Sequence, residues 1–181
     1  MPAYHSQFVK APQVVGNVAL LPLRTNFKGP APRARESDED IIDEALYFFK
    51  ANIFFRNYEI KSPADRTLIY ITMYITECLR KLQKCPNKTA AQKDLTTLAL
   101  SQAFPIPGES GFPLNALYKA ATNGTDEDTM RSYFQQLRQE TSARLIEKVF
   151  AFGSERPLKW WTCFAKKRFM EKCLLPPGAN I

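Results

Sequence analysis

Glycine and histidine are scarce in this chain of 181 residues, and their scarcity excludes several classes of enzyme. The seven glycines can be fitted neither to the GxGxxG fingerprint of a dinucleotide site nor to the GxxxxGK[ST] loop of nucleotide hydrolases. The single histidine is His5, and a residue so close to the start of the chain is a poor place for a general base. We therefore expect no catalytic residues and no cofactor.

Paired cysteine motifs are also missing. The four cysteines form no CxxC pair, and with only one histidine they match no zinc-site spacing, so no metal site is expected. They are predicted to be free thiols in a reducing compartment. Two disulfides are the alternative, which is weakened because Cys78 and Cys85 lie too far apart along one predicted helix to bridge each other. The four are Cys78, Cys85, Cys163 and Cys173.

No long apolar run is present. The most apolar uncharged stretch, Thr67 to Thr76, has about half of the ~20 residues that a membrane-spanning helix needs, so no membrane insertion is expected. The segment from Val14 to Leu23 has the apolar character of a signal peptide, but it contains Asn17 and Pro22 and no small-residue cleavage site follows it. We take it as part of the mature chain, with a targeting segment as the alternative.

Acidic residues are absent from the first 35 positions, which carry a net charge of +5. Residues 36–44 then carry −6, residues 45–155 carry +3 and residues 156–173 carry +5, which gives the total of +7. The basic surplus therefore lies at the two ends. Five prolines and the lack of helical periodicity predict that residues 1–36 form an extended arm, with one short strand around Val14 to Leu21. This arm either packs across the domain or reaches a partner.

The remaining sequence predicts an all-α fold, a single compact domain of about six helices over residues 37–175, followed by a flexible tail at 176–181. Apolar residues recur every three or four positions, and each segment opens with a capping residue or a proline. The most apolar segment, which starts at Pro63, is predicted to be the central helix. The predicted helices begin at Ser37, Pro63, Thr89, Pro113, Thr125 and Pro157, and the last carries its aromatic residues through Phe169.

Basic and aromatic residues alternate between Arg156 and Phe169. Such a string is typical of a core-packing helix with a solvated basic face, of a helix at a protein interface, or of a surface for nucleic acid or membrane. Trp160 lies about 100° from the main apolar face of a helix, so core packing explains it least. Elsewhere the sequence offers no combination of nucleophile, base and oxyanion donor.

Nine segments, in order over most of the chain, closely resemble subunit 3 of the actin-related protein 2/3 complex. The chain departs from that family at residues 10–15, 86–102 and 120–128 and after Cys173. The matching segments are MPAYHS (1–6), NVALLPLR (17–24), FKGPAP (27–32), DEALYFFKAN (43–52), ADRTLIYIT (64–72), FPIPG (104–108), GFPLN (111–115), QQLRQET (135–141) and KWWTCF (159–164).

The resemblance implies a non-enzymatic, mainly helical subunit of a seven-protein assembly that starts a new actin filament on the side of an existing one. It implies that this subunit packs against actin-related protein 3 and other subunits, lies near the mother filament, and is cytoplasmic, at cortical actin or actin patches. It also implies that nucleotide hydrolysis belongs to the actin-related subunits.

Exposure and charge suggest which residues make these contacts. Complementary charge toward acidic actin and its relatives would aid register and association rate. A free-standing nucleic-acid-binding helical domain is the alternative function, and it predicts affinity that falls steeply with salt. The interface candidates are Tyr4, His5, Tyr58, Lys61, Trp160, Lys166, Lys167 and Arg168.

Overall fold

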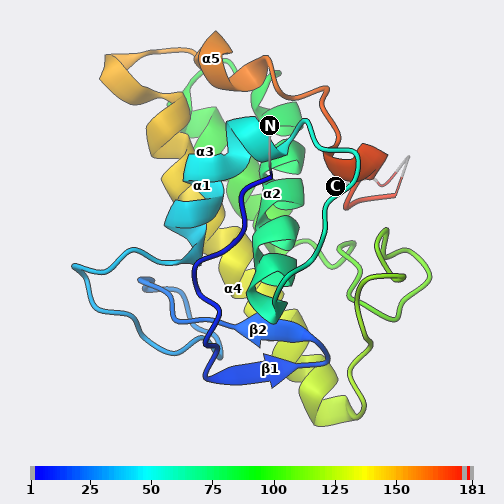
Figure 1. The fold of residues 1–181 in the computed structure, drawn as a ribbon. Coiled ribbons are helices and arrows are strands. Elements are labelled where there is room, and N and C mark those ends of the chain that lie inside the picture. The colour runs from blue at the N-terminus through cyan, green and yellow to red at the C-terminus, as the bar shows by residue number, and fades with distance from the viewer. Residues whose placement is uncertain (1–2, 177–178, 180–181) are drawn as a thin grey trace.

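The computed structural model describes residues 3–176 and residue 179. Its helices gather around a central helix, and a small β-hairpin lies at one end of that helix (Figure 1). Within residues 3–176 no helix is both long and apolar enough to cross a bilayer. The elements in chain order are β1 (Gln13–Val15), β2 (Val18–Leu20), α1 (Ile41–Asn52), α2 (Pro63–Leu82), α3 (Lys88–Leu100), α4 (Gly124–Val149), η1 (Ala151–Gly153), α5 (Lys159–Thr162) and η2 (Phe169–Glu171).

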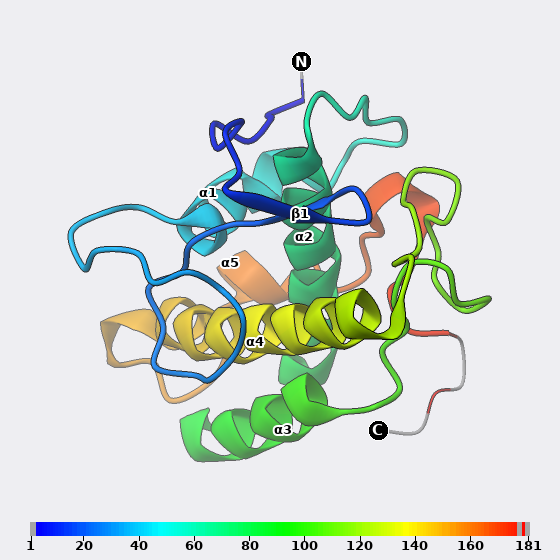
Figure 2. The ribbon, with the colours of Figure 1, turned by 90° about the horizontal axis from the view of Figure 1, so that it is seen from below.

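Helix α2 is the centre of the molecule, as its sequence predicts. It begins at Pro63, and every residue from Thr67 to Leu79 is buried. Helix α4 crosses it, and α3 lies along α4 on the side away from α1 (Figure 2). At the crossing the rings of Tyr70 and Phe134 stack with centroids 3.9 Å apart. A continuous apolar core thus joins α2 to its neighbours.

The hairpin adds a second strand to the one predicted in the N-terminal arm, so the fold is mainly and not wholly helical. Strands β1 and β2 pair antiparallel, with Gln13 opposite Leu20 and Val15 opposite Val18, in the region where one strand was predicted. Gly16 turns the chain with φ of 60°, a backbone conformation that L residues rarely adopt. A Cβ atom at Gly16 would also lie 2.6 Å from the carbonyl oxygen of Lys119, so a side chain there would be excluded.

The rest of the N-terminal segment packs across the helices, which is the first of the two alternatives for the arm. The Thr67 hydroxyl on α2 donates to the carbonyl of Ala19 at 2.7 Å. The Tyr133 hydroxyl on α4 accepts from the N–H of Leu21 at 2.9 Å and donates to its carbonyl at 3.1 Å. The amide of Gln136 bridges the carbonyl of Phe27 and the N–H of Ala31. Residues 1 and 2, and most of the predicted tail, lie outside the described residues.

Three predicted helix starts are wrong by a few residues. A side chain is an effective N-cap where it accepts from the backbone N–H groups of the first turn. In α1, Asp40 accepts from the N–H groups of Ile42 and Asp43 and forms a capping box. The observed caps of α1, α3 and α4 are Asp40, Asn87 and Asn123, in place of the predicted Ser37, Thr89 and Thr125.

An ion-pair network fixes the start of α1 against α4. The guanidinium of Arg144 donates to both carboxylate oxygens of Asp40, at 2.6 and 2.7 Å, and to Asp43 at 3.0 Å. It also donates to the carbonyl of Arg24 at 2.7 Å. Burial disfavours the charged guanidinium, but the hydrogen bonds and charge of Asp40 outweigh it and raise the pKa of Arg144. The network therefore joins three segments that are distant in sequence.

Residues 113–121 form turns instead of the predicted helix. Their backbone groups are bound by side chains from elsewhere. Arg66 Nε donates to the carbonyl of Leu117 at 2.7 Å, and the N–H of Lys119 donates to the side-chain oxygen of Asn17 at 2.8 Å. These tertiary bonds replace the ladder that a helix would make.

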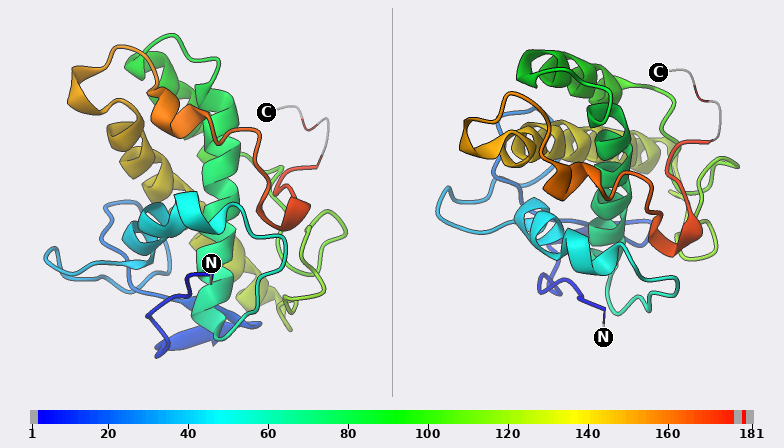
Figure 3. Two further views of the ribbon diagram at one scale, coloured as in Figure 1. Left: turned by 45° about the horizontal axis from the view of Figure 1, so that its top comes forward. Right: turned by 90° about the horizontal axis from the view of Figure 1, so that it is seen from above.

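The last predicted helix is also wrong, because α5 ends at Thr162. Tight turns follow, in which the N–H groups of Phe164, Ala165 and Lys167 donate three residues back. The N–H of Met170 then donates to the carbonyl of Phe55 at 3.0 Å, so the chain turns toward the loop after α1. Figure 3 shows this C-terminal segment lying along α1 and the end of α2.

Candidate protein interface

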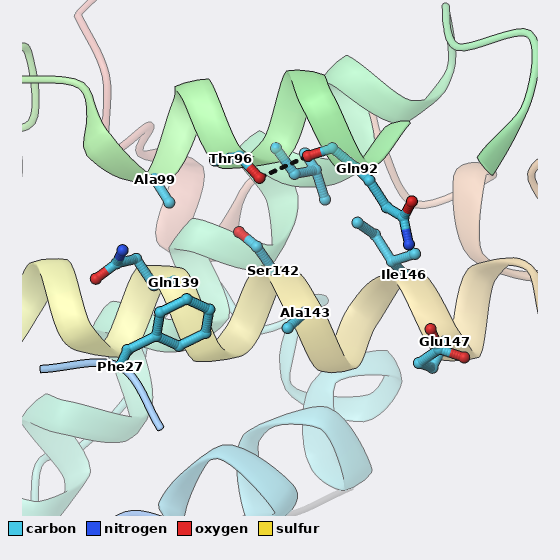
Figure 4. A pocket seen from close by; sticks show the side chains of 10 residues that line it. Phe27, Gln92, Thr96, Ala99, Gln139, Ser142, Ala143, Ile146 and Glu147 are labelled. Carbon is cyan, nitrogen blue, oxygen red and sulfur yellow. Dashed lines mark hydrogen bonds between the residues drawn. The ribbon is translucent and has the colours of Figure 1, made fainter. Parts of the chain in front are cut away.

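A groove between α3 and α4 provides no catalytic arrangement. Its volume is about 200 Å³ and its floor is formed by small and apolar side chains, with Phe27 over one end (Figure 4). Two hydroxyl side chains line it: Ser142 shares a 2.6 Å hydrogen bond with the Tyr74 hydroxyl, and Thr96 donates to the carbonyl of Gln92 at 2.7 Å. Glu147 at its rim forms a 3.0 Å ion pair with Lys88. No base therefore lies beside a nucleophile in this groove.

The cysteines are free thiols, as predicted. All four lie within the described residues and none is bonded to another. Burial raises the pKa of Cys78 to about 12, and burial beside Asp94 raises that of Cys85 to about 11. Two thiols of the helical core are therefore packing groups of low reactivity.

Two of the interface candidates, His5 and Lys61, meet at one buried carboxylate. Asp65, in the first turn of α2, accepts from the N–H of Ser6 at 2.8 Å and from the N–H of Lys61 at 2.9 Å. The Nδ1 atom of His5 lies 2.8 Å from the same carboxylate. Asp65 therefore ties residues 5 and 6 to the loop before α2, and His5 is half-buried in this arrangement.

Tyr4 and Tyr58 differ in their exposure. Tyr58 is 5% exposed, and its hydroxyl donates to the carbonyl of Tyr4 at 2.6 Å. Burial and the nearby Asp65 raise the pKa of Tyr58, so its hydroxyl stays a donor. Tyr4 is 46% exposed and stacks on Phe48 with centroids 4.7 Å apart. Tyr4 therefore presents one ring face outward, whereas Tyr58 belongs to the core.

A surface of aromatic rings and lysines covers the outer side of α1 and α5. The Lys50 ammonium lies 4.0 Å from the centre of the Trp160 ring and 4.3 Å from that of Trp161. The Lys167 ammonium lies 5.2 Å from the Phe54 ring centre. We call this the aromatic–lysine surface, and it consists of Tyr47, Lys50, Phe54, Trp160, Phe164 and Lys167.

Exposure separates two neighbouring tryptophans in this region. Trp160 is 70% exposed, as its position off the apolar face predicts, whereas Trp161 is 8% exposed and stacks on Phe49. Tyr47 is 84% exposed and Phe54 is 58% exposed. Rings this exposed contribute little to the protein's own core, so they are available to a partner.

The electrostatics of the surface are basic. Lys166, Lys167 and Arg168 are consecutive exposed residues in the turns after α5. Burial lowers the pKa of Lys50, and the positive charge of Lys148 lowers it further, against the opposing effect of Cys163. The neighbouring cations thus face the same region, which favours an acidic partner.

Sequence reasoning missed Tyr47, Lys50 and Phe54 as members of this surface. The available signal was their spacing, because positions 47, 50 and 54 follow the i, i+3, i+7 pattern of a second helical face.

Comparison with known proteins agrees with these observations. The family described as "P21-Arc: ARP2/3 complex ARPC3 (21 kDa) subunit" matches residues 1–174. The chain belongs to this family. It is 60% identical over 185 residues to the "Probable actin-related protein 2/3 complex subunit 3" of Caenorhabditis elegans, covering 100% of both chains. It is 53% identical over 176 residues to subunit 3 of Schizosaccharomyces pombe, covering 96% of this chain and 100% of that one.

The match extends to more distant members. Subunit 3 of Dictyostelium discoideum is 49% identical over 174 residues, which cover 94% of this chain and 99% of that one. The resemblance found in the sequence segments is therefore confirmed over the full chain. The family consists of non-catalytic subunits of this complex.

Proposed function

We propose that this chain is a structural subunit of the branched actin nucleation complex, that it packs against actin-related protein 3, and that it lies near the mother filament of the branch. Family membership supports its place in such a complex. The observation that carries the contact is the aromatic–lysine surface, whose Trp160 is 70% exposed beside three consecutive cations. The site of action is then the actin cytoskeleton.

The chemistry of this surface fits an acidic protein partner. Exposed tryptophan and tyrosine supply large contact area at low cost in conformational entropy, and such residues are enriched at interface centres. The surrounding cations steer an acidic partner and fix its register more than they add affinity. Lys166, Lys167 and Arg168 are the proposed steering residues, and Tyr4 and His5 are proposed as a second contact at the N-terminal segment.

The test is a charge reversal of Lys166, Lys167 and Arg168 to glutamate in the reconstituted complex. We expect slower branch formation in a pyrene-actin assay at moderate salt, or lower recovery of the complex. The matched control reverses the exposed lysines Lys10, Lys93 and Lys119, which changes the net charge equally, from +7 to +1. Equal assembly kinetics for the two variants and the wild type would remove these three residues from the interface.

A second experiment tests membership itself. The tagged chain is purified under native conditions through a salt wash, and its partners are identified by mass spectrometry. A structural subunit is recovered with its partners in stoichiometric amounts. Recovery of a lone chain bound to nucleic acid, with affinity that falls steeply with salt, would instead establish the nucleic-acid alternative.

A further inference from the structure

Phe152 is the most exposed large apolar side chain among the described residues. It is 100% exposed and lies in the loop that joins α4 to α5, within η1. This loop protrudes beside α5 in Figures 1 and 3. A phenylalanine in such a position gives the subunit no packing energy of its own.

The backbone of Phe152 is strained as well. Its φ is 59° and its ψ is 29°, the left-handed region that costs a bulky residue about 1–2 kcal/mol. Met170 and Glu171 share this conformation. Met170 donates its N–H to Phe55 and packs against the core, which compensates for the strain there, whereas the pair of Glu171 with Arg56 is solvent-exposed and adds little. Phe152 has no compensating side-chain contact within residues 3–176, so its strain calls for an external partner.

Hydrogen bonds hold the loop in this shape. The N–H of Leu158 donates to the carbonyl of Val149 at 2.9 Å and closes the base of the loop. Inside the loop, the N–H of Ser154 donates to the carbonyl of Ala151 at 3.2 Å. The Ser154 hydroxyl donates to the carbonyl of Arg156 at 2.6 Å. The ring of Phe152 is thus presented from a closed loop, which lowers the entropy cost of binding.

The charge around the loop indicates the chemistry of the partner. Lys148 precedes the loop, Arg156 lies within it and Lys159 follows it, all with exposed side chains. Glu155 is the one acidic residue between Lys148 and Lys159, and the loop leads directly into Trp160. A complementary surface is therefore an apolar pocket with an acidic rim.

We propose that Phe152 is an anchor residue that enters an apolar, acid-rimmed pocket on another protein subunit of the complex. This inference rests on the proposed function. A protein pocket is favoured over a bilayer because one aromatic side chain on a hydrogen-bonded loop offers little apolar area for insertion, whereas a single buried anchor can dominate a protein interface.

The test is Phe152→Asn in the reconstituted complex. Asparagine tolerates the left-handed backbone, so the loop keeps its shape while the ring is lost. We expect the subunit to dissociate from the complex about 30-fold more readily, measured by exchange against labelled wild-type chain, as for other central aromatic anchors. The unfolding temperature of the free full-length chain should stay equal or rise, which a residue of the subunit's own core would not allow.

Leu100→Asn is the matched control, because Leu100 is also exposed, at 43%, but lies at the end of α3. It should leave exchange unchanged. If the wild type is retained and Phe152→Asn is retained equally well, the anchor is refuted and the proposed function stands. If the wild type itself is not retained, the proposed function fails.

Two further outcomes would overturn the inference. The first is unchanged exchange combined with a loss of binding to vesicles of equimolar phosphatidylcholine and phosphatidylserine, which would assign Phe152 to a bilayer. The second is unchanged exchange combined with a loss of self-association of the free chain, which would assign it to a second copy.

Discussion

The two ends of the chain have the same charge and use their side chains in opposite ways. Residues 1–35 and residues 156–173 each carry a net charge of +5. In the N-terminal segment, backbone N–H groups at Tyr4, Ser6 and Gln7 donate to side chains of α1 and α2. In the C-terminal segment, backbone bonds close local turns and leave Trp160 exposed.

This difference shows that composition alone does not identify a docking surface. The N-terminal segment binds acceptor side chains of the helices, so removing those bonds should lower the free energy of unfolding. The exposed rings of the C-terminal segment lie outside the core, so removing them should weaken binding to a partner. Substitutions in the two segments should therefore separate a loss of stability from a loss of binding.

The largest effect on stability is expected from Arg144→Ala. Asp40 is fully buried, and removal of Arg144 leaves its carboxylate without its ion-pair partner. Breaking a buried pair in this way costs about 3–5 kcal/mol, measurable as a lower urea midpoint. Arg131→Ala is the control, because its pairs with Glu109 and Glu127 are solvent-exposed and should contribute under about 1 kcal/mol. Equal midpoints for the two variants would contradict the role of the network.

The adjacent tryptophans give a sharper comparison within the C-terminal segment. Trp161→Ala removes a buried ring and should lower the free energy of unfolding by about 3 kcal/mol. Trp160→Ala should change it by less than about 1 kcal/mol, the scale of its contact with Lys50. At a temperature where both variants are folded, Trp160→Ala should be retained in the complex less well than Trp161→Ala. A stability loss at Trp160 as large as at Trp161 would place both rings in the core.

The long helices could be predicted because the apolar positions that recur along the sequence are the positions that are buried in the fold. α2 and α4 combine many buried positions, and small errors at their caps do not alter them. The turns at 113–121 could not be predicted, because the bonds from Arg66 and Asn17 that replace a helix come from distant segments. The exposure of Trp160 followed from its angle on a helix, whereas Phe152 carries no sequence signal, since its strain exists only in the folded loop.

A smaller effect is expected from Tyr58→Phe, which removes one hydrogen bond of the N-terminal segment. The hydroxyl donates to the carbonyl of Tyr4 at 2.6 Å, and its loss should cost about 1 kcal/mol. Proteolysis within the first residues should become faster, because Tyr4 loses one of its ties to the helices. Tyr47→Phe is the control, since the Tyr47 ring is 84% exposed and its change should alter neither property. Unchanged proteolysis in Tyr58→Phe would show that Asn52, which also binds Tyr4, suffices.

The smallest effect, and one of opposite sign, is expected from Glu44→Gln. Burial, together with the charges of Asp65 and Glu39, raises the pKa of Glu44 above its ordinary value of 4.5, despite a hydrogen bond from the N–H of Gln7. A raised pKa means that the folded state favours the protonated carboxyl, so the wild type loses stability as the pH rises through that pKa. Glutamine keeps an acceptor for Gln7 and carries no charge.

The variant should therefore unfold at a slightly higher temperature than the wild type at pH 7.5, and this difference should vanish well below pH 4.5, where Glu44 is protonated in both states. Glu59→Gln removes the same charge from an exposed side chain and should show no such pH-dependent gain. If the higher unfolding temperature persists at low pH, the effect comes from packing and the charge of Glu44 has no part in it. If it appears only at neutral pH, Glu44 accepts from the N-terminal segment at an electrostatic cost to the fold. The exposed, uncharged rings of the C-terminal segment carry no such cost.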